Sequence, residues 1–258
     1  MPEGDTVWLA AHRLDQALSG EVLLSADLRV PALATVDLAG CTVREVVPRG
    51  KHLLFRLDDG RTLHTHFRME GSWHLYRPGA RWHGGPDHEV RAVLRTEPWV
   101  AVGYRLPVVE LLPTDREHEV VGHLGPDLLG PDWDPDEALR RLKADPAREV
   151  ADALRDQRNL AGIGNIYACE SLFICGVDPF RPVSTVDDLA EVVLTAHRLL
   201  TRNAPRPSQA TTGDERRPHY VHGRRGRPCY RCGTAIRMRE QGQRPQSRMT
   251  FWCPTCQR

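Results

Sequence analysis

The stretch Cys229-Tyr-Arg-Cys232, followed after twenty intervening residues by Cys253-Pro-Thr-Cys256, decides the fold at the C-terminal end of this 258-residue chain. Two C-x2-C pairs at this separation can place four thiolates at the corners of a tetrahedron around one Zn²⁺. Because cysteine fills all four positions, none remains for a catalytic water, and we expect this zinc to hold structure. The other three of the seven cysteines are interpreted as buried small hydrophobes: Cys41, Cys169 and Cys175.

Arginine dominates the segment between and around the two cysteine pairs. The arginines of the expected hairpin are Arg231, Arg237, Arg239, Arg244 and Arg248. From Arg202 to Arg258 there are 13 arginines against three acidic residues, so this end carries +10 and the rest −9 within a net charge of +1. A cationic end on an acidic chain indicates a polyanionic partner, most simply nucleic acid. A zinc ribbon of a ribosomal or transcription protein would share this feature, so it indicates binding and not catalysis.

Upstream of the cysteines, the turn Gly162-Ile-Gly-Asn165 precedes an apolar stretch that we expect to be helical over 165–175. Gly162 and Gly164 permit tight backbone geometry, and Asn165 opens a helix whose N–H groups and positive dipole end favour a phosphate. An ordinary helix–turn–helix with an asparagine cap explains the same spacing, which leaves both readings open. Further helices are expected at 136–144, 147–157 and 186–202, and the Pro/Arg-rich segment 203–218 is expected to be a mobile loop.

The first half of the chain is predicted to be rich in strands, behind one leading helix. That helix is expected from Thr6 to about Ser19, with Asp5 as its cap and Gly20 as its stop. Strands are expected at Glu21–Val30, Thr42–Val47, Lys51–Leu57, Arg61–Phe67, Trp73–Tyr76, Val90–Leu94, Val100–Val102 and Val108–Leu112. The pattern predicts an α+β chain that begins with a β-sandwich.

From the composition and the first residues we expect neither a membrane-spanning helix nor a secretory signal peptide. No apolar run approaches the roughly 18 residues of a spanning helix, and the start, MPEGD, is acidic where a signal peptide would be basic. We therefore expect a cytoplasmic protein that does not contact membranes.

The N-terminus offers an amine suited to covalent chemistry. Initiator methionine is commonly removed before a small residue, which would leave Pro2 with a free secondary amine. An α-amine has a pKa near 8, against about 10.4 for lysine, so far more of it is neutral near pH 7. Attack of such an amine on an aldehydic carbon gives an iminium, which eases elimination next to it. Many proteins begin Met-Pro, but this chain has only two lysines, Lys51 and Lys143, beside 33 arginines.

Ordered motifs along nearly the whole chain resemble the formamidopyrimidine-DNA glycosylase/endonuclease VIII family. They are MPEG at 1–4, PRGKH at 48–52, HTHFRMEGSW at 64–73, HLGPDLL at 123–129, GIGNIYACESLF at 162–173 and RMTFWCPTCQR at 248–258. The resemblance implies a catalytic β-sandwich, a helix–two-turn–helix domain and a C-terminal zinc-finger hairpin, which we place at 1–114, 115–218 and 219–258. It also implies a monomeric, bifunctional DNA glycosylase and AP lyase of base excision repair, which holds damaged or abasic DNA between its domains.

For the catalytic residues, the resemblance implies the following roles. Pro2 matches the nucleophile that attacks C1′ of the damaged nucleotide, and Glu3 matches the acid/base that protonates the opening sugar. Lys51 and Arg248 match residues that grip phosphate beside the lesion. Three of these assignments have an alternative. Glu3 would then be an ordinary carboxylate at a helix N-terminus, Lys51 a surface lysine and Arg248 a solvated arginine.

For DNA binding, the resemblance implies that Asn165, after Gly164, binds the backbone beside the lesion. Met69 matches a residue that wedges into the gap left by an everted base, although a core methionine is the competing reading. His64 and His66 share one strand face, as a metal pair would, but no acidic or cysteine ligand is evident nearby. Packing or a phosphate contact by His66 is therefore favoured.

Several positions depart from the family's guanine-lesion branch. Thr6 stands where that branch has a glutamate, MPEG replaces MPEL, and the 102–108 region lacks the arginine–phenylalanine wedge. The loop at 203–218 is short, and His222 stands where the family has a tyrosine. These departures favour the endonuclease VIII branch and oxidised pyrimidines as substrates. A non-catalytic damaged-DNA binder, or a zinc-ribbon RNA-binding factor, remains an alternative, and the sequence does not rank lesions or choose between duplex and single strands.

Overall fold

The computed structural model describes residues 2–243 and 247–258, so Met1 and Arg244 lie outside the described residues. The chain divides into two compact units, Met1–His123 and Leu124–Arg258. Among the helices of the described residues, none has both the length and the apolar character to cross a membrane.

The first unit begins with helix α1 (Gly4–Leu18), whose predicted apolar face of Val7, Ala11, Leu14 and Leu18 is buried. The helix starts earlier than expected, and the prediction of Asp5 as its cap is wrong. Asp5 already lies in the first helical turn, where the helix dipole favours a carboxylate. The residue before the helix is Glu3, with an extended backbone and no side-chain cap hydrogen bond.

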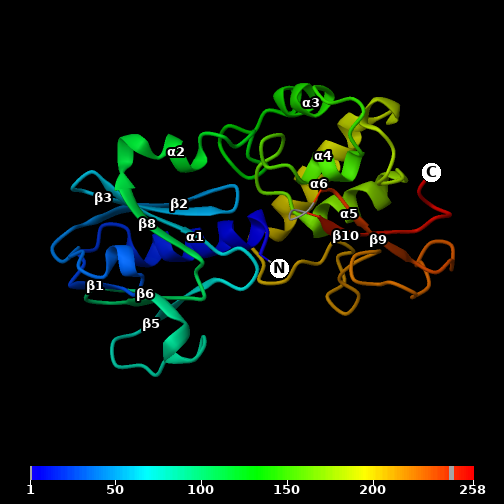
Figure 1. The fold of residues 1–258 in the computed structure, drawn as a ribbon. Helices are drawn as coiled ribbons and strands as arrows, with labels where there is room; N and C mark the ends of the chain where they lie inside the picture. Colours follow the sequence, from blue (N-terminus) through cyan, green and yellow to red (C-terminus); the bar gives the residue numbers. More distant parts are fainter. Residues whose placement is uncertain (1, 244–246) are drawn as a thin grey trace. The chain divides into compact units, whose positions relative to one another are not determined.

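Two antiparallel sheets form a sandwich with α1 between them in the view of Figure 1. One has the order β2 (Val43–Arg49), β3 (His52–Leu57), β4 (Arg61–His66), β8 (Val108–Pro113), and the other β1 (Ser25–Leu28), β6 (Val90–Arg95), β7 (Val100–Tyr104), β5 (Ser72–Tyr76). One hydrophobic cluster takes residues from α1 and from both sheets. The predicted β-sandwich is thus confirmed, although β1 is much shorter than the expected 21–30.

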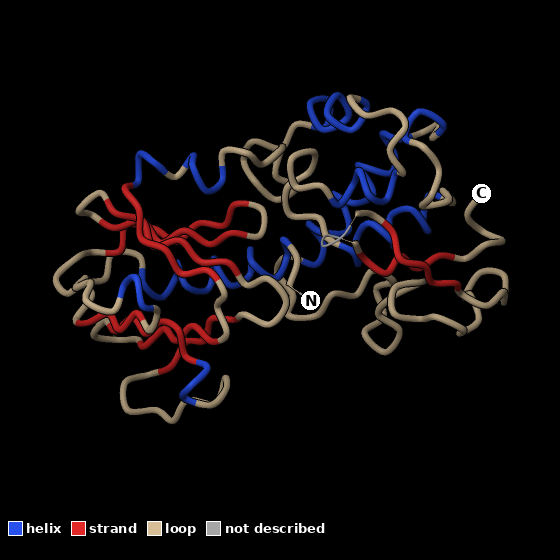
Figure 2. Tube along the Cα trace, viewed as in Figure 1, coloured by secondary structure: helices blue, strands red, loops and turns tan. Residues whose placement is uncertain are grey.

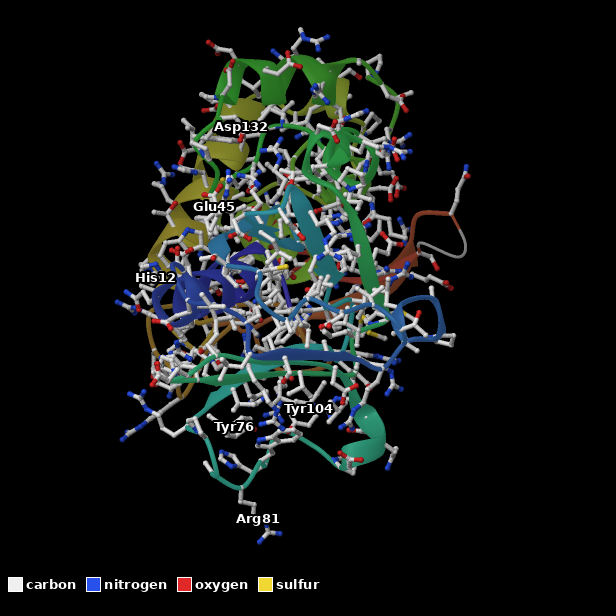
Figure 3. All side chains as sticks on the ribbon, turned by 90° about the vertical axis from the view of Figure 1, so that its left-hand side faces the viewer. His12, Glu45, Tyr76, Arg81, Tyr104 and Asp132 are labelled. Atoms are coloured by element: carbon white, nitrogen blue, oxygen red, sulfur yellow. The ribbon has the colours of Figure 1, made fainter. Side chains whose placement is uncertain are left out.

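The outer face of the second sheet carries a small core of its own. Tyr76 and Tyr104 lie below this sheet in Figure 3, on the side where the loop that carries Arg81 runs. The Tyr76 hydroxyl accepts hydrogen bonds from the backbone N–H groups of His83 (3.2 Å) and Gly84 (3.0 Å). The remaining short helices of this unit are η1 (Pro31–Leu33), η2 (Asp87–Glu89), η3 (Thr114–Arg116) and α2 (His118–Val121).

The second unit is helical and ends in a two-stranded hairpin (Figure 2). Its elements are α3 (Pro135–Lys143), α4 (Val150–Arg155), α5 (Asn165–Cys175), η4 (Val183–Thr185), α6 (Leu189–Asn203), β9 (Arg237–Gln241) and β10 (Arg248–Trp252). Two helices are shorter than expected. Extended backbone at Glu149 and Asp156 bounds α4, and the Asp188 carboxylate accepts from Glu191 N–H, which fixes the start of α6. Asn203 still belongs to α6, and residues 204–218 form a loop, as predicted.

Helix α5 is the central element of this unit. It is apolar on all sides, with every residue from Asn165 to Phe173 buried, and it contacts α4, α6 and β10. Gly176 ends it in the left-handed conformation, φ 74°. The position of Asn165 is therefore set by a helix that is held from several directions.

Candidate functional site

The N-terminal residues are fixed to a rigid element. Pro2 is half-buried, and Glu3, at the N-cap position of α1, is fully buried. The Val7 N–H donates to the Glu3 carbonyl at 3.1 Å, and the Asp15 carboxylate accepts from the Val46 N–H at 2.7 Å, which ties α1 to β2. The residue that follows Pro2 is thus fixed at the start of a helix that cannot move without disturbing the sandwich core.

Lys51 lies in the tight turn Gly50-Lys51 between β2 and β3, not within a strand as expected. The turn forms because Arg49 already pairs with His52, which leaves two residues to reverse the chain. The next residue, His52, faces His66 across β3 and β4. Lys51 and His66 therefore belong to the same end of one sheet.

A group of histidines lies at this end of the sheet. His52 Nδ1 is 2.8 Å from His64 Nε2, His64 Nδ1 is 3.2 Å from Glu110 Oε2, and the rings of His52 and His66 meet edge to face at 4.7 Å. Burial, helped by the charges of neighbouring histidines, lowers the pKa of His52 to about 2. Burial and the charge of Lys51 lower the pKa of His66 to about 4. These rings are neutral near pH 7, and His66 Nδ1 accepts from the Arg68 N–H at 2.8 Å.

Met69 lies in the turn after β4 and its exposed fraction is 60%. The turn is tight, because Arg68 has φ 47° and the Gly71 N–H donates to the Phe67 carbonyl at 2.9 Å. The core-methionine reading is therefore wrong, since a large apolar side chain is presented to solvent.

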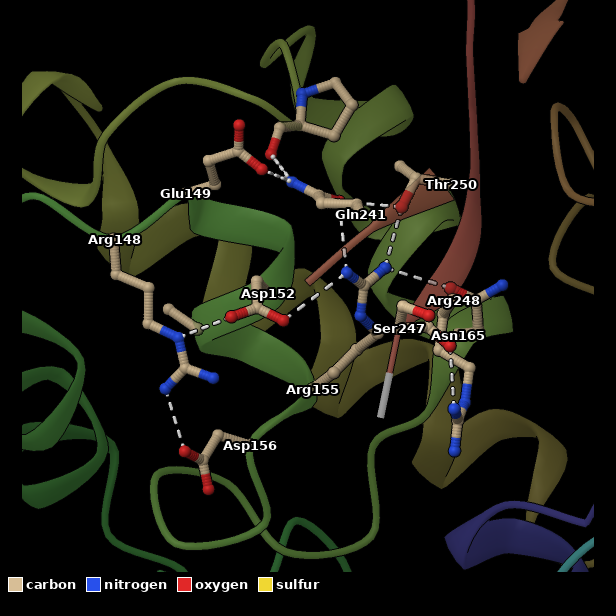
Figure 4. Close-up of polar contacts among 12 residues, drawn as sticks. Arg148, Glu149, Asp152, Arg155, Asp156, Asn165, Gln241, Ser247, Arg248 and Thr250 are labelled. Carbon is tan, nitrogen blue, oxygen red and sulfur yellow. Dashed lines mark hydrogen bonds and ion pairs between the residues drawn. The ribbon is translucent and has the colours of Figure 1, made fainter. Parts of the chain in front are cut away.

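Asn165 is the first residue of α5, and the residue before it, Gly164, occupies the N-cap position. The reading of Asn165 as a cap is wrong, because its side chain makes other contacts. Its Oδ1 accepts from Arg155 Nη1 at 3.1 Å (Figure 4). Its Nδ2 donates to the Met249 carbonyl at 2.8 Å. Gly162, at φ 92°, needs its glycine, whereas Gly164 has an extended backbone, φ −132°, that any residue can adopt.

The four cysteines converge at the C-terminal end. Their Sγ atoms all lie within 4.8 Å of one another, with Cys229 to Cys256 at 3.9 Å and Cys232 to Cys253 at 3.4 Å. Zinc–sulfur bonds of about 2.3 Å in a tetrahedron require sulfur atoms a little under 4 Å apart, so the cluster fits Zn²⁺. The Arg231 N–H also points to Cys229 Sγ at 3.4 Å, as in a zinc knuckle. Among the described residues this is the one group of three or more histidine, cysteine and acidic ligands arranged for a metal.

The arginines of the hairpin have different surroundings. Arg248 begins β10, is exposed, and donates to the carbonyl of Ser247 at 2.8 Å. Arg231 instead donates to the carbonyls of Phe173 (3.0 Å) and Ile174 (3.3 Å), near the C-terminal end of α5. Arg231 therefore anchors the zinc module to α5, whereas Arg248 is exposed and its side chain hydrogen-bonds to the neighbouring residue.

Sequence reasoning missed two buried charged residues of the second unit. Glu170 is fully buried in α5, where its carboxylate accepts the N–H groups of Tyr220 (2.8 Å), Val221 (2.8 Å) and His222 (2.9 Å). A glutamate inside an otherwise apolar helix was the available signal, because a buried charge needs partners. Arg155, described above, gave no such signal, since it ends a short helix among other arginines.

Two family profiles match the chain, the formamidopyrimidine-DNA glycosylase N-terminal domain over residues 1–105 and the formamidopyrimidine-DNA glycosylase H2TH domain over residues 124–204. "Probable endonuclease 8 2" of Streptomyces coelicolor is 55% identical over all of this chain and 94% of its own length. "DNA-(apurinic or apyrimidinic site) lyase Nei2" of Mycolicibacterium smegmatis is 45% identical over 100% of this chain and 99% of its own. "Endonuclease 8" of Escherichia coli is 32% identical over the full length of both.

Solved structures of similar fold include the Fpg protein of Lactococcus lactis in complex with DNA that contains N7-benzyl-Fapy-dG. That structure has a TM-score of 0.82 and 23% sequence identity, and the match covers 100% of both chains. A second structure of the same protein, non-covalently bound to DNA with an AP site, has a TM-score of 0.82 at 22% identity and covers 99% of both chains. The likeness shows that the order of sandwich, helices and hairpin is a known fold.

Proposed function

Because the chain belongs to the formamidopyrimidine-DNA glycosylase/endonuclease VIII family, we propose that it is a DNA glycosylase and AP lyase of base excision repair. The observation that carries this is that Pro2, which bears the mature α-amine once Met1 is removed, directly precedes the fully buried Glu3 at the start of α1. The relatives' names, endonuclease 8 and DNA-(apurinic or apyrimidinic site) lyase, support the same activity.

The reaction begins at the N-terminal nitrogen. The Pro2 nitrogen bonds to C1′ while the N-glycosidic bond breaks, and the base leaves with the bonding electrons. The nitrogen gives up its proton, and the departing base takes up one in exchange. Glu3 protonates the sugar ring oxygen as the ring opens, which leaves an iminium between Pro2 and C1′. Since the α-amine is less basic than a lysine, enough of it is neutral near pH 7 to attack.

The iminium then allows strand cleavage. Loss of the C2′ proton expels the phosphate on the 3′ side, and a second elimination expels the phosphate on the 5′ side. Water finally hydrolyses the iminium and frees Pro2. The proposed products are a one-nucleotide gap flanked by phosphates and a released sugar fragment.

Binding is assigned to both units. In the first unit, Lys51 and the neutral ring of His66 offer donors for phosphate at one end of a sheet, and exposed Met69 offers an apolar wedge. Eversion of a base costs a few kcal/mol, less for a damaged pair, and a wedge can fill the vacated stack. In the second unit, Asn165 and Arg248 offer donors for the backbone, and the zinc holds the hairpin that bears Arg248.

The departures from the guanine-lesion branch favour oxidised pyrimidines as substrates. Thr6, the short 203–218 loop and the 102–108 region all differ from what that branch uses for its lesion and opposite base. The endonuclease 8 names of the relatives agree with this choice. A cytoplasmic monomer acting on the nucleoid remains our expectation.

Borohydride trapping on an abasic-site oligonucleotide tests the proposal. Wild-type protein should form a covalent adduct and nick the strand, and Pro2→Gly should lower trapping sharply, because a primary amine on a flexible residue replaces the fixed secondary amine. Lys143→Arg is the matched control, because it removes an exposed amine of α3 to which no part of the chemistry is assigned. Undiminished trapping by Pro2→Gly would show that the fixed secondary amine is not required, and wild-type binding without nicking would leave a damaged-DNA binder.

A further inference from the structure

Arg155, at the end of α4, lies in a polar network that the proposed chemistry does not use (Figure 4). Its side chain is only 9% exposed. Nη1 donates to Asn165 Oδ1 (3.1 Å) and to Thr250 Oγ1 (2.8 Å), and Nη2 donates to Gln241 Oε1 (3.1 Å). One guanidinium therefore joins the first residue of α5 to both strands of the C-terminal hairpin.

The partners of Arg155 are neutral oxygens. The nearest carboxylate oxygen, Asp152 Oδ1, is 3.8 Å away, and the other oxygen of Asp152 already binds Arg148 Nε at 2.6 Å. Arg155 and Asp152 thus form only a long ion pair, beyond hydrogen-bond distance, while the hydrogen bonds of the guanidinium go to neutral oxygens. Burial of a cation is costly, so a group of this kind is retained for its geometry or for its field. Burial lowers the pKa of Arg155, yet a guanidinium stays protonated at neutral pH.

A guanidinium offers donors only, and this fixes the direction of the amide groups that it touches. The amide of Asn165 must turn its oxygen toward Arg155, which places its NH₂ group at the Met249 carbonyl, 2.8 Å away. The amide of Gln241 is fixed in the same way, with its Nε2 donating to Glu149 Oε2 (2.7 Å) and to the Pro179 carbonyl (2.9 Å). If the Asn165 amide were reversed, its NH₂ group would face the guanidinium N–H, and two donors would meet with no acceptor between them.

The same contacts set the position of Arg248. Thr250 lies two residues further along β10, on the same strand face, is fully buried, and donates to Gln241 Oε1 at 2.7 Å while it accepts from Arg155. Met249, whose carbonyl holds Asn165, lies between them. The two proposed backbone contacts of the second unit, Asn165 and Arg248, are thus linked through one buried side chain.

We infer that Arg155 is a positioning residue, which holds the Asn165 amide and the start of β10 in one arrangement so that both bind the same stretch of DNA backbone. This inference rests on the proposed function of Asn165 and Arg248 as backbone contacts. Arg155 itself touches no phosphate and acts through its neighbours.

The test is a double-mutant cycle read out by binding. The proteins are wild type, Arg155→Met, Asn165→Ala and the double variant, and the probe is a duplex with a tetrahydrofuran abasic analogue, followed by fluorescence anisotropy. Loss of a charge-assisted hydrogen bond weakens binding about tenfold or more, so we expect each single variant to lose about that factor. If Arg155 acts through Asn165, the double variant should be no weaker than the weaker single one.

Two further variants separate positioning from bulk stability. Arg155→Lys keeps the charge but cannot span three acceptors, and we expect it to bind between wild type and Arg155→Met. Arg140→Met, which removes an exposed ion-paired arginine from α3, should bind as wild type. If Arg155→Met does not fold, judged by zinc content and thermal unfolding, the cycle is built with Arg155→Lys instead.

The inference would be overturned if the double variant lost affinity by the product of the factors lost by the Arg155 variant and by Asn165→Ala. Wild-type affinity of the folded Arg155→Met or Arg155→Lys protein would also overturn it. Nicking of a true abasic site by the wild type is measured in parallel. The cycle measures binding alone. Absence of nicking would therefore refute the proposed chemistry and leave the role of Arg155 standing. Nicking by the wild type together with affinity losses that multiply would support the chemistry and refute the role of Arg155.

Discussion

The two units of this protein hold their candidate functional residues in different ways. In the first unit, Pro2, Lys51 and Met69 lie before a helix, in a two-residue turn and in an exposed loop, each carried by the rigid sandwich. In the second unit, Asn165 is oriented by Arg155 through buried hydrogen bonds from α4 and the hairpin. The first arrangement places reactive groups by local backbone, whereas the second fixes donors through contacts distant in sequence.

This difference predicts that the two units contribute to different steps of the reaction. Changes in the first unit should alter the rate of chemistry at saturating DNA, whereas changes in the second should alter affinity. The expected effects are largest for zinc, smaller for Glu3 and smallest for the buried histidines.

Removal of zinc should abolish binding to abasic-site DNA. A structural zinc contributes on the order of 10 kcal/mol to the folding of small zinc fingers, far more than any single hydrogen bond, so the hairpin should not hold without it. We would measure anisotropy and zinc content of Cys256→Ser and of chelator-treated protein. Cys175→Ser, outside the cluster, is the control and should behave as wild type. Full binding by metal-free protein would show that the hairpin stands without the metal.

Glu3→Gln should lower the rate of base release and strand scission while leaving affinity nearly unchanged. General acid–base groups contribute about a hundredfold or more to rate, and the amide cannot donate the proton. Single-turnover assays at saturating protein would give the rate, and anisotropy would give the affinity. The matched control is Glu21→Gln, a half-buried carboxylate on the loop after α1. A loss confined to affinity would show that Glu3 only supports structure.

The buried histidines should make stability depend on pH. The pKa of His52 is lowered to about 2 and that of His66 to about 4, below their ordinary value of 6.5. Below about pH 6.5 these histidines become protonated in the unfolded chain but stay neutral in the folded protein. The free energy of unfolding therefore decreases as the pH is lowered, by up to about 1.4 kcal/mol per pH unit for each histidine. The fall continues until the folded pKa is reached.

His52→Gln should make that fall shallower between about pH 6 and pH 4, as measured by urea unfolding. The other titratable groups around His52 are Lys51, Glu110, His64, His66 and His123. His88→Gln, on an exposed position of η2, is the control and should leave the slope unchanged. An unchanged slope in His52→Gln would mean that the ring already protonates in the folded protein.

Most of the fold could be predicted from the sequence, and the errors have physical reasons. Apolar periodicity is local, so the strands of the sandwich and the helices of the second unit were found to within a few residues. Boundaries were less certain, as for α4 and α6, because capping by Asp188 and the backbone around Glu149 decide them. The cap was assigned to Asp5, although helix α1 had already begun at Gly4.

The candidate site also has parts that depend on local sequence and parts that depend on distant contacts. Cysteine spacing and the glycine turn are patterns of neighbours in sequence, and they predict the metal cluster and the opening of α5. The free amine at Pro2 stays a prediction. The role of Arg155 and the partners of Glu170 could not be predicted, because their contacts lie many residues away. The exposure of Met69 and the convergence of the histidines likewise depend on which strands pair.

By itself the sequence determined which chemical groups this protein has and in which local element each is carried, since spacing and periodicity act over a few residues. Only the tertiary structure decided how those groups are oriented. An amide or a carboxylate takes its direction from donors that the fold brings to it, and for Asn165 those donors come from the preceding helix, with the hairpin accepting on the other side.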